Sequence, residues 1–337
     1  MLDMRSVSDT FCLTIGDPTG IGPEITARFL AHQAALPEDG VNLRIFGDIA
    51  NLVQTADALG IELPEGTRFD YENTQYIRYS SDRKTPGQVA YESIEASVSE
   101  IQAGKAHALV TGPISKENLQ LAGVPYSGHT EMLQHLARKA YGQPYQSDML
   151  FVYRHFRMLL LTRHVSLRKV SETLSIREVN QSLANLAEFF QSACKIQSPR
   201  LCVLGVNPHA GEIDGEEEER ILKPALKLVS ERYGFGIEPP VAADAAFRHF
   251  DINRLHYDAY VAAYHDQGLI PFKMVAGLNA VNITIGLPFL RTSVSHGTAP
   301  DIVGQGLADP CSLIEAYKAA FQLSNSLPSK PEPVLSC

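Results

Sequence analysis

Short apolar runs alternate along this chain with longer stretches in which apolar residues recur at helical spacing. A short continuous apolar run is typical of a buried strand, and apolar positions three and four residues apart are typical of an amphipathic helix. The pattern predicts strands at 11–15, 43–46, 108–110, 149–153, 158–162, 201–206, 259–264 and 281–285. It predicts helices at 25–35, 49–59, 88–103, 130–140, 176–194, 216–229 and 312–323, and an irregular stretch at 61–87. Alternating strands and helices indicate an α/β fold with a mostly parallel sheet and helices on both of its faces.

The length of 337 residues suits two domains or one large two-lobed unit. We expect one two-lobed unit with a cleft between the lobes. One lobe is expected to contain roughly residues 11–130 and 280–330, and the other roughly residues 131–280. The two ends, residues 1–10 and 326–337, are rich in Ser and Pro and are expected to be loose tails.

The charge balance excludes one large class of function. The chain has 29 Lys and Arg against 38 Asp and Glu, which gives a net charge of −9. It therefore lacks the excess of basic residues that is typical of a nucleic-acid-binding protein. No apolar window is long enough to cross a membrane, and the first residues do not resemble a signal peptide. Five cysteines, an odd number without a CxxC pair, favour free thiols in a reducing cytoplasm.

Three histidines, His164, His209 and His265, each lie just after a predicted strand. Loops that follow strands are where α/β proteins bind their ligands. Three imidazoles at three strand ends can converge on one metal ion and leave positions open for a substrate. Their spacing forms no local motif, however, and a single such histidine is more often an ordinary hydrogen-bonded residue. Both interpretations stay open on these grounds.

A second group of polar residues lies within 19 residues of sequence. Lys273 offers an ammonium, Asn282 an amide and Arg291 a planar guanidinium. A phosphate monoester is bound by donors of these types. The alternative is a solvated surface, but apolar neighbours flank Lys273 and Arg291. The group therefore favours an anionic small-molecule substrate.

Two further loops are rich in glycine. GDPTGIGPE at 16–24 has neither the dinucleotide-binding nor the P-loop spacing, and a tight strand-to-helix turn with Pro23 near the helix start explains it. His129 and Thr130 open a predicted helix, where Thr130 can act as the N-cap and an anion is favoured. A cap alone explains this loop equally well.

Two other segments favour ordinary roles. The acidic run Glu216–Glu219 is expected at a helix start, where negative charge suits the helix dipole. Ser295 and His296 are adjacent and no GxSxG motif is present, so a serine hydrolase is disfavoured.

Six segments occur in the order found in one enzyme family: GDPTGIGPE, TGPISK, SGHTEML, NPHAGE, YHDQGLIPFK and NITIGLPFLRTSVSHGTAPDI. From about residue 11 to 323 the chain resembles the 4-hydroxythreonine-4-phosphate dehydrogenase family of pyridoxal phosphate biosynthesis. The resemblance implies a fold like that of isocitrate and isopropylmalate dehydrogenases, and a homodimer. It also implies an oxidoreductase that uses NAD or NADP to oxidise the C3 hydroxyl of 4-phosphooxy-L-threonine. The resulting β-keto acid loses CO₂ and gives 3-amino-2-oxopropyl phosphate.

The resemblance also implies site residues. A divalent metal (zinc, alternatively magnesium or cobalt) is expected on His164, His209 and His265, in a site completed across the dimer interface. The substrate contacts of the family fall on His129, Thr130, Lys273, Asn282 and Arg291. All eight positions match the family in residue type.

The chemistry agrees with a metal. A secondary alcohol gives up hydride only as it loses its proton, and a metal can lower the pKa of bound water from 15.7 to about 7, which corresponds to roughly 12 kcal/mol. One side-chain hydrogen bond supplies about 1 kcal/mol. The acceptor of the proton is left open between Asp244 and Lys116, for which a buried structural carboxylate and a helix-surface lysine are the ordinary interpretations. The cofactor is expected near Ser293, His296 and Asp301, because GxGxxG is absent and the resembling fold binds its dinucleotide there.

Four functions remain to be compared. Related enzymes oxidise D-threonate or D-erythronate 4-phosphate, which the residues above do not distinguish from the amino-acid phosphate. Others oxidise aromatic cis-dihydrodiols, which need no phosphate site. A phosphotransacetylase-like acyl transferase would not need three histidines at strand ends. A catalytically silent binding protein would not be expected to keep the whole polar set.

Overall fold

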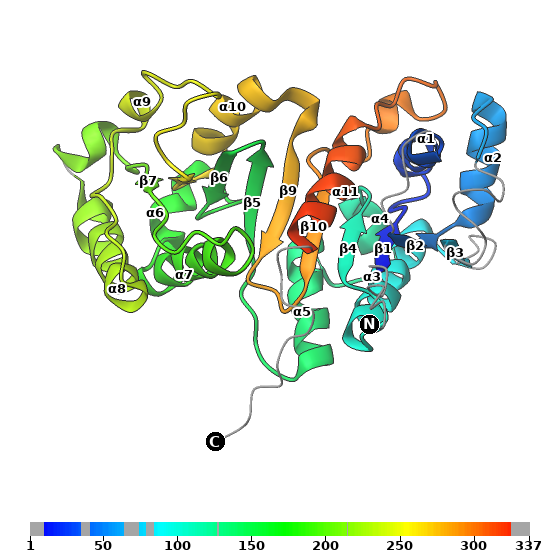
Figure 1. Ribbon diagram of the computed structural model, residues 1–337, viewed down its shortest axis with the longest axis horizontal. Helices are drawn as coiled ribbons and strands as arrows, with labels where there is room; N and C mark the ends of the chain where they lie inside the picture. Colours follow the sequence, from blue (N-terminus) through cyan, green and yellow to red (C-terminus); the bar gives the residue numbers. More distant parts are fainter. Residues whose placement is uncertain are drawn as a thin grey trace, which may run out of the picture. The chain divides into compact units, whose positions relative to one another are not determined.

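The computed structural model describes residues 10–34, 41–63, 74–78, 84–126, 128–213 and 215–324. The chain divides into two compact units (Figure 1). Gln146–Gly286 forms the central unit, named for its place in the sequence, and Met1–Tyr145 with Leu287–Cys337 forms the terminal unit. The expected tails lie outside the described residues, apart from Thr10.

The terminal unit is built on five strands in the order β3-β2-β1-β4-β10. These are β1 (Thr10–Thr14), β2 (Asn42–Gly47), β3 (Thr74–Arg78), β4 (Ala108–Thr111) and β10 (Leu290–Val294). Every neighbouring pair is parallel. All residues of β4 and β10 are buried, as expected of parallel strands that are covered on both faces.

Helices cover both faces of these strands. They are α1 (Gly22–Ala34), α2 (Ile49–Leu59), α3 (Pro86–Gln102), α4 (Lys116–Leu121), α5 (His129–Tyr141) and α11 (Cys311–Ser324). Val98 of α3 and Leu133 of α5 share a buried cluster with Leu109 of β4. A separate aromatic group joins Phe11 of β1 and Phe29 of α1 to Tyr317 of α11, with ring centroids 5.8 and 5.3 Å from that of the tyrosine.

The central unit has five strands in the order β9-β5-β6-β8-β7. These are β5 (Asp148–Tyr153), β6 (Phe156–Leu160), β7 (Leu201–Val203), β8 (Ala259–Ala262) and β9 (Val281–Ile285). Strand β5 is antiparallel to both of its neighbours, whereas β6, β8 and β7 are parallel to one another. The carboxyl ends of β6, β8 and β7 therefore lie at one edge of the sheet.

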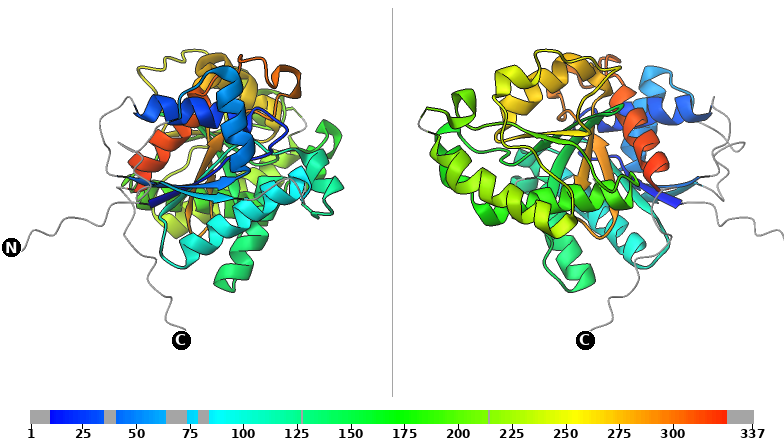
Figure 2. Two further views of the ribbon diagram at one scale, coloured as in Figure 1. Left: turned by 90° about the vertical axis from the view of Figure 1, so that its right-hand side faces the viewer. Right: turned by 60° about the vertical axis from the view of Figure 1, so that its left-hand side comes forward.

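The helices of the central unit are α6 (Val170–Thr173), α7 (Ile176–Ser192), α8 (Lys223–Tyr233), α9 (Ala243–Ala246) and α10 (His265–Ala276). Short turns of helix lie between them: η1 (Leu167–Lys169), η2 (Pro208–Gly211), the π-helical η3 (Glu218–Leu222) and η4 (Gly277–Asn279). Helices α7 and α8 pack side by side (Figure 2). Phe272 of α10 packs on the sheet beside Phe156 of β6, with 5.0 Å between their rings.

The predicted α/β fold with a mostly parallel sheet is confirmed, and the predicted strands and helices are present with small shifts at their ends. Six of the described strands and helices were not predicted, namely β3, β10, α4, α6, α9 and α10. Strand β3 lies in the stretch predicted to be irregular, β10 carries the polar sequence LRTSV, and α10 contains Gly268 and Pro271, which are poor helix formers. No helix in the described ranges is long and apolar enough to cross a membrane.

Candidate active site

The three strand-end histidines lie in the central unit, after the three neighbouring parallel strands. His164 follows β6, His265 follows β8, and His209 follows β7. The rings of His164 and His265 are 5.8 Å apart, centroid to centroid. The topology therefore brings two of the predicted metal ligands together.

The side chain of His265 is oriented by its neighbour in the sequence. Its Nδ1 lies 2.7 Å from Oδ1 of Asp266, at the start of α10. A carboxylate on one ring nitrogen of a histidine holds the proton there and leaves the other nitrogen for a metal ion. The arrangement thus suits His265 to bind through Nε2.

Hydrogen bonds connect the loops at this edge of the sheet. Thr162, just before His164, donates through its hydroxyl and its amide to the carbonyl of Ala263, at 2.7 and 3.1 Å. Gln267 accepts from the amide of Ala263 at 2.7 Å and donates to the carbonyl of Gly205 at 2.6 Å. The loops after β6, β8 and β7 are consequently tied to one another.

His209 is exposed, and its backbone is left-handed, with φ +57°. In the described part of the chain, no three His, Cys, Asp or Glu side chains are grouped so that they can hold one metal ion. A single chain therefore does not gather all three predicted ligands. Helix α9, which carries the exposed Asp244, packs against the turn η2 that contains His209. Asp244 is not the buried structural carboxylate that was its alternative interpretation.

Helix α10 and the turn η4 that follows it present a row of exposed apolar side chains. Ile270 and Met274 of α10 are 61% and 82% exposed and lie four positions apart, and Leu278 of η4 is 55% exposed. Residues four apart lie on one side of a helix. Lys273 is exposed on the same helix. Asn282 of β9, in contrast, is buried, and its Oδ1 has no hydrogen-bond partner among the described residues.

Two predicted substrate residues of the terminal unit, Arg291 and His129, lie close enough for the charge of Arg291 to act on the imidazole. Arg291 of β10 is 1% exposed and donates through Nη2 to the hydroxyl of Thr111 at 2.6 Å. Burial lowers the pKa of Arg291 to about 9, which leaves it charged at neutral pH. Burial, together with the charge of Arg291, holds the pKa of His129 well below its ordinary value. The Nε2 atom of His129 is buried without a hydrogen-bond partner in the ranges that the structure describes.

Thr130 lies in the first turn of α5, but it does not cap the helix. The helix begins at His129, and the capping position is Gly128, which offers no side chain. The predicted cap was therefore wrong. The hydroxyl of Thr130 lies at the helix N-terminus, where an anion is favoured.

The GDPTGIGPE loop is a closely packed turn, as its ordinary interpretation requires. Oδ1 of Asp17 accepts from the amide and hydroxyl of Thr19 at 2.8 and 2.6 Å, and Oδ2 accepts from Asn118 of α4 at 2.8 Å. A Cβ atom on Gly16 (φ +89°) would lie 2.1 Å from the carbonyl of Pro113, so only glycine fits there. Lys116 is exposed at the start of α4.

The same loop holds the segment that carries the predicted cofactor residues. The amide of Ile21 donates to the carbonyl of Thr298 at 3.0 Å. Buried Glu24 accepts from Arg28 and from the amide of Ala308, each at 3.0 Å, and Arg28 donates to the carbonyl of Gly306 at 2.7 Å. These contacts join helix α1 to the loop that follows β10.

The three predicted cofactor residues differ in accessibility. Ser293 is buried in β10 and its hydroxyl donates to the carbonyl of Val294 at 3.0 Å. His296 is half-buried, with Nδ1 2.9 Å from the carbonyl of Gly297. Asp301 is exposed in the short helical turn η5 (Pro300–Ile302). Of the three side chains, those of His296 and Asp301 are accessible from the loop.

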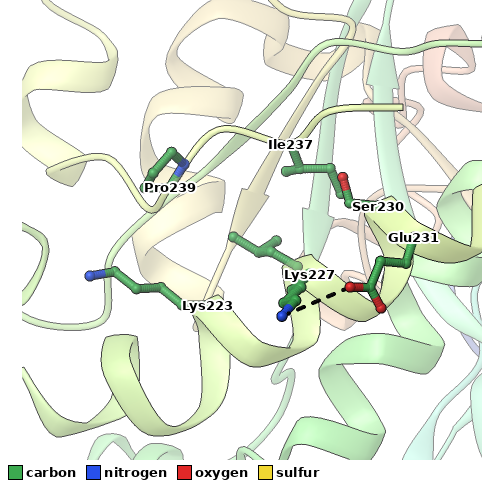
Figure 3. Close-up of a pocket in the computed structure, with 7 residues that line it drawn as sticks. Lys223, Lys227, Ser230, Glu231, Ile237 and Pro239 are labelled. Carbon is green, nitrogen blue, oxygen red and sulfur yellow. Dashed lines mark ion pairs between the residues drawn. The ribbon is translucent and has the colours of Figure 1, made fainter. Parts of the chain in front are cut away.

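A cavity of about 510 Å³ lies elsewhere, between α8 and the segment that follows it (Figure 3). It is lined by Lys223, Leu226, Lys227, Ser230, Glu231, Ile237 and Pro239. Lys227 lies 3.9 Å from Glu231 across one turn of the helix. None of the residues predicted to bind metal, substrate or cofactor lines this cavity.

Comparison with known proteins places these features in a family. The family described as "Pyridoxal phosphate biosynthetic protein PdxA" matches residues 28–320. A 4-hydroxythreonine-4-phosphate dehydrogenase from Bradyrhizobium diazoefficiens is 38% identical, over 93% of this chain and 96% of its own. A D-threonate 4-phosphate dehydrogenase from Cupriavidus necator is 36% identical, over 93% and 96%. The crystal structure of the 4-hydroxythreonine-4-phosphate dehydrogenase from Klebsiella pneumoniae superposes with a TM-score of 0.79 at 31% identity, covering 94% of this chain and all of that one.

Proposed function

Because the chain belongs to the PdxA family of pyridoxal phosphate biosynthetic proteins, we propose that it is a 4-hydroxythreonine-4-phosphate dehydrogenase. The substrate is 4-phosphooxy-L-threonine, and the C3 hydroxyl is oxidised with NAD⁺ or NADP⁺ as the hydride acceptor. The β-keto acid so formed loses its carboxylate as CO₂ and gives 3-amino-2-oxopropyl phosphate. The observation that carries the proposal is the pair His164 and His265 at one sheet edge, in a chain that also buries Arg291 beside His129.

The donor set suits a divalent metal such as zinc, magnesium or cobalt. Neutral imidazoles bind such ions and leave them their positive charge. Asp266 already orients His265 for binding through Nε2. The ion would be held by His164, His209 and His265, and it would supply stabilisation of the negative charge that develops on the C3 oxygen.

A homodimer accounts for the position of His209. Within one chain His209 is not grouped with the other two histidines, and it is exposed. Exposed Ile270 and Met274 lie on the helix that begins at His265, and exposed Leu278 lies in the turn η4 that follows it. A row of large exposed apolar residues is typical of a protein–protein interface. We therefore assign the third ligand to His209 from a second copy of the chain.

The anionic groups of the substrate need fixed cations. Arg291 offers a buried guanidinium, and Lys273 an exposed ammonium that can turn toward a ligand. His129 is neutral at pH 7 because its pKa is lowered, so it binds the substrate as a hydrogen-bonding group. Thr130 and Asn282 supply further polar atoms, and Oδ1 of Asn282 can accept a hydrogen bond from the substrate.

The reaction also needs an acceptor for the hydroxyl proton. Asp244 is the candidate we favour, because its helix packs against the turn that carries His209. The exposed Lys116 in α4 is the alternative. The hydride acceptor is proposed to bind at the loop of His296 and Asp301, which Ile21 and Glu24 hold in place through backbone atoms.

A second substrate is favoured by a specific finding. Relatives called D-threonate 4-phosphate dehydrogenase match this chain at 36% identity, close to the 38% of the amino-acid phosphate enzyme. The two substrates differ at C2, where one has a hydroxyl and the other an amine. None of the residues above distinguishes these groups by charge alone.

The deciding experiment follows the absorbance of reduced nicotinamide with purified protein. 4-Phosphooxy-L-threonine, D-threonate 4-phosphate and D-erythronate 4-phosphate are compared with NAD⁺ and with NADP⁺, with and without EDTA. We expect the fastest rise with 4-phosphooxy-L-threonine, and its loss in EDTA. Faster oxidation of a sugar-acid phosphate would instead favour the alternative function, a D-threonate or D-erythronate 4-phosphate dehydrogenase. A metal-independent reaction would contradict the proposed site, and no oxidation of any of the three would contradict the proposal as a whole.

The cysteines Cys12, Cys194, Cys202 and Cys311 of the described part are free, which supports a reducing compartment such as the cytoplasm.

A further inference from the structure

Glu218 is a buried carboxylate to which none of the proposed chemistry assigns a role. It is the first residue of the π-helical turn η3 and is 0% exposed. The acidic run lies at a helix start, as the sequence predicted, but Glu218 is buried there rather than solvated. A buried carboxylate is costly unless several hydrogen bonds satisfy it, and π-helical turns are frequent at functional sites.

The hydrogen bonds of Glu218 lead to the turn that carries His209. Its Oε1 accepts from the backbone amide of Asn207 at 2.8 Å, and its Oε2 accepts from Nδ2 of Asn207 at 2.9 Å. Asn207 is two residues before His209 in the sequence. Nδ2 of Asn207 also donates to Oε2 of Glu217 at 2.8 Å, so Glu218 shares the side chain with Glu217 and itself binds the main-chain amide at the start of this turn.

The turn packs tightly around the carboxylate. A Cβ on Gly205 would lie 3.2 Å from Oε1 of Glu218, and one on Gly211 would lie 2.8 Å from Oε2. Gly205 precedes the turn, and Gly211 is its last residue. Glu218 is thus enclosed by the same loop whose main chain it binds, and the loop has little freedom to shift around it.

The conformation that this packing maintains is strained. His209 and Ala210 have φ of +57° and +53°, and Gly211 follows with +84°. Residues with a Cβ rarely adopt the left-handed region, and they persist there only where the surroundings force them to. In this conformation His209 is exposed rather than packed into its own unit.

We propose that Glu218 is a positioning residue for the metal ligand His209. It holds Asn207, and through it keeps His209 and Ala210 in the strained left-handed turn that directs the imidazole outward. Without the carboxylate, the turn is expected to relax toward ordinary backbone angles, and His209 is then no longer poised for the ion. This inference rests on the proposed function, which gives His209 an ion to bind.

The test measures Zn²⁺ affinity of the metal-free, full-length protein by competition with a chromophoric chelator. In Glu218→Gln one oxygen becomes an amide donor that faces a donor of Asn207, so one of the two bonds is lost. We expect the Zn²⁺ affinity to fall about 10–100-fold, the range found when a residue that orients a metal ligand is changed. Glu219→Gln is the matched control, because Glu219 is exposed, adjacent and of equal charge.

A rescue separates positioning from general support of the fold. Ala210→Gly removes the Cβ that makes the left-handed conformation costly at that position. Added to Glu218→Gln, it is expected to recover several-fold of the lost Zn²⁺ affinity. A purely structural role of Glu218 would lower the thermal midpoint without this recovery. Should Glu218→Gln not fold, Asn207→Ala removes the side-chain bonds of Asn207 to Oε2 of Glu218 and to Oε2 of Glu217, and the same loss of affinity is expected.

The outcomes are distinguishable. Wild-type Zn²⁺ affinity in Glu218→Gln, with loss of affinity in His209→Ala, overturns the positioning role and leaves the proposed function standing. Unchanged affinity in His209→Ala overturns the proposed ligand set and this inference with it. An equal loss in Glu219→Gln, or no recovery with Ala210→Gly, also overturns the positioning role.

Discussion

The Nδ1 atom of His265 lies 2.7 Å from Oδ1 of Asp266, the next residue in the chain. The histidine opens helix α10, and its ring lies 5.8 Å from that of His164. One short contact therefore decides which nitrogen of His265 faces away from the carboxylate. Such an orienting carboxylate is a frequent companion of a metal-binding histidine.

Asp266→Asn tests this relationship. The amide cannot hold the proton on Nδ1 as a carboxylate does, so we expect Zn²⁺ affinity to fall about 10–100-fold. Asp266 is exposed, with 74% of its side chain accessible, so the thermal midpoint is expected to change little. Chelator competition measures the affinity, and unaltered binding in Asp266→Asn would show that the contact has no part in the site.

Mixing two inactive variants tests the shared site. His209→Ala and His265→Ala each remove one proposed ligand and are expected to be folded and inactive. If the metal is held by histidines from two copies, hybrid dimers contain one intact site. An equal mixture that is allowed to exchange subunits should then recover about a quarter of the wild-type rate. A mixture that stays inactive although hybrids form would place all three ligands on one chain.

Met274→Glu tests the dimer surface. Met274 is 82% exposed and lies in the apolar row between Ile270 of α10 and Leu278 of η4, and a charge there would be buried in the proposed interface. We expect a monomer in light scattering, with loss of metal-dependent activity. Leu121→Glu is the control, because Leu121 is 74% exposed but lies outside this row. A Met274→Glu protein that remains dimeric would exclude this surface.

The lowered pKa of His129 predicts a pH dependence of stability. Burial and Arg291 favour the neutral imidazole in the folded protein, whereas the unfolded chain takes up a proton near pH 6.5. The unfolded state binds more protons in that range, so stability is full above about pH 6.5 and declines as the pH falls below it. His129→Gln should weaken this decline in thermal unfolding between about pH 8 and pH 5. An identical pH profile in the variant would show that His129 does not cause the decline.

Glu24→Gln tests the contact between helix α1 and the proposed cofactor loop. Glu24 is 2% exposed and accepts from Arg28 and the amide of Ala308. Loss of a charge-assisted bond at such a site costs about 1–3 kcal/mol, so the thermal midpoint should fall by several degrees. We also expect the KM for the dinucleotide to rise more than kcat falls. A lower midpoint with an unchanged KM would limit Glu24 to a structural role.

The sequence was sufficient for what depends on local pattern. Periodicity predicted the order of most strands and helices, and the placement of His164, His209 and His265 just after predicted strands led to the prediction of a site at one edge of the sheet. Motif order indicated the family, which the comparisons confirm over residues 28–320. These properties follow from neighbours a few residues apart, which the linear chain displays directly.

Tertiary structure alone decided which polar groups are buried and what they touch. Arg291 meets Thr111 across 180 positions of the chain, and Glu24 meets Ala308 across 284. In the sequence Glu218 is one member of an acidic run expected at a helix start, and only the structure shows that the turn around His209 encloses it. Periodicity carries no information about such contacts, because they depend on how distant segments pack and on the desolvation that packing imposes.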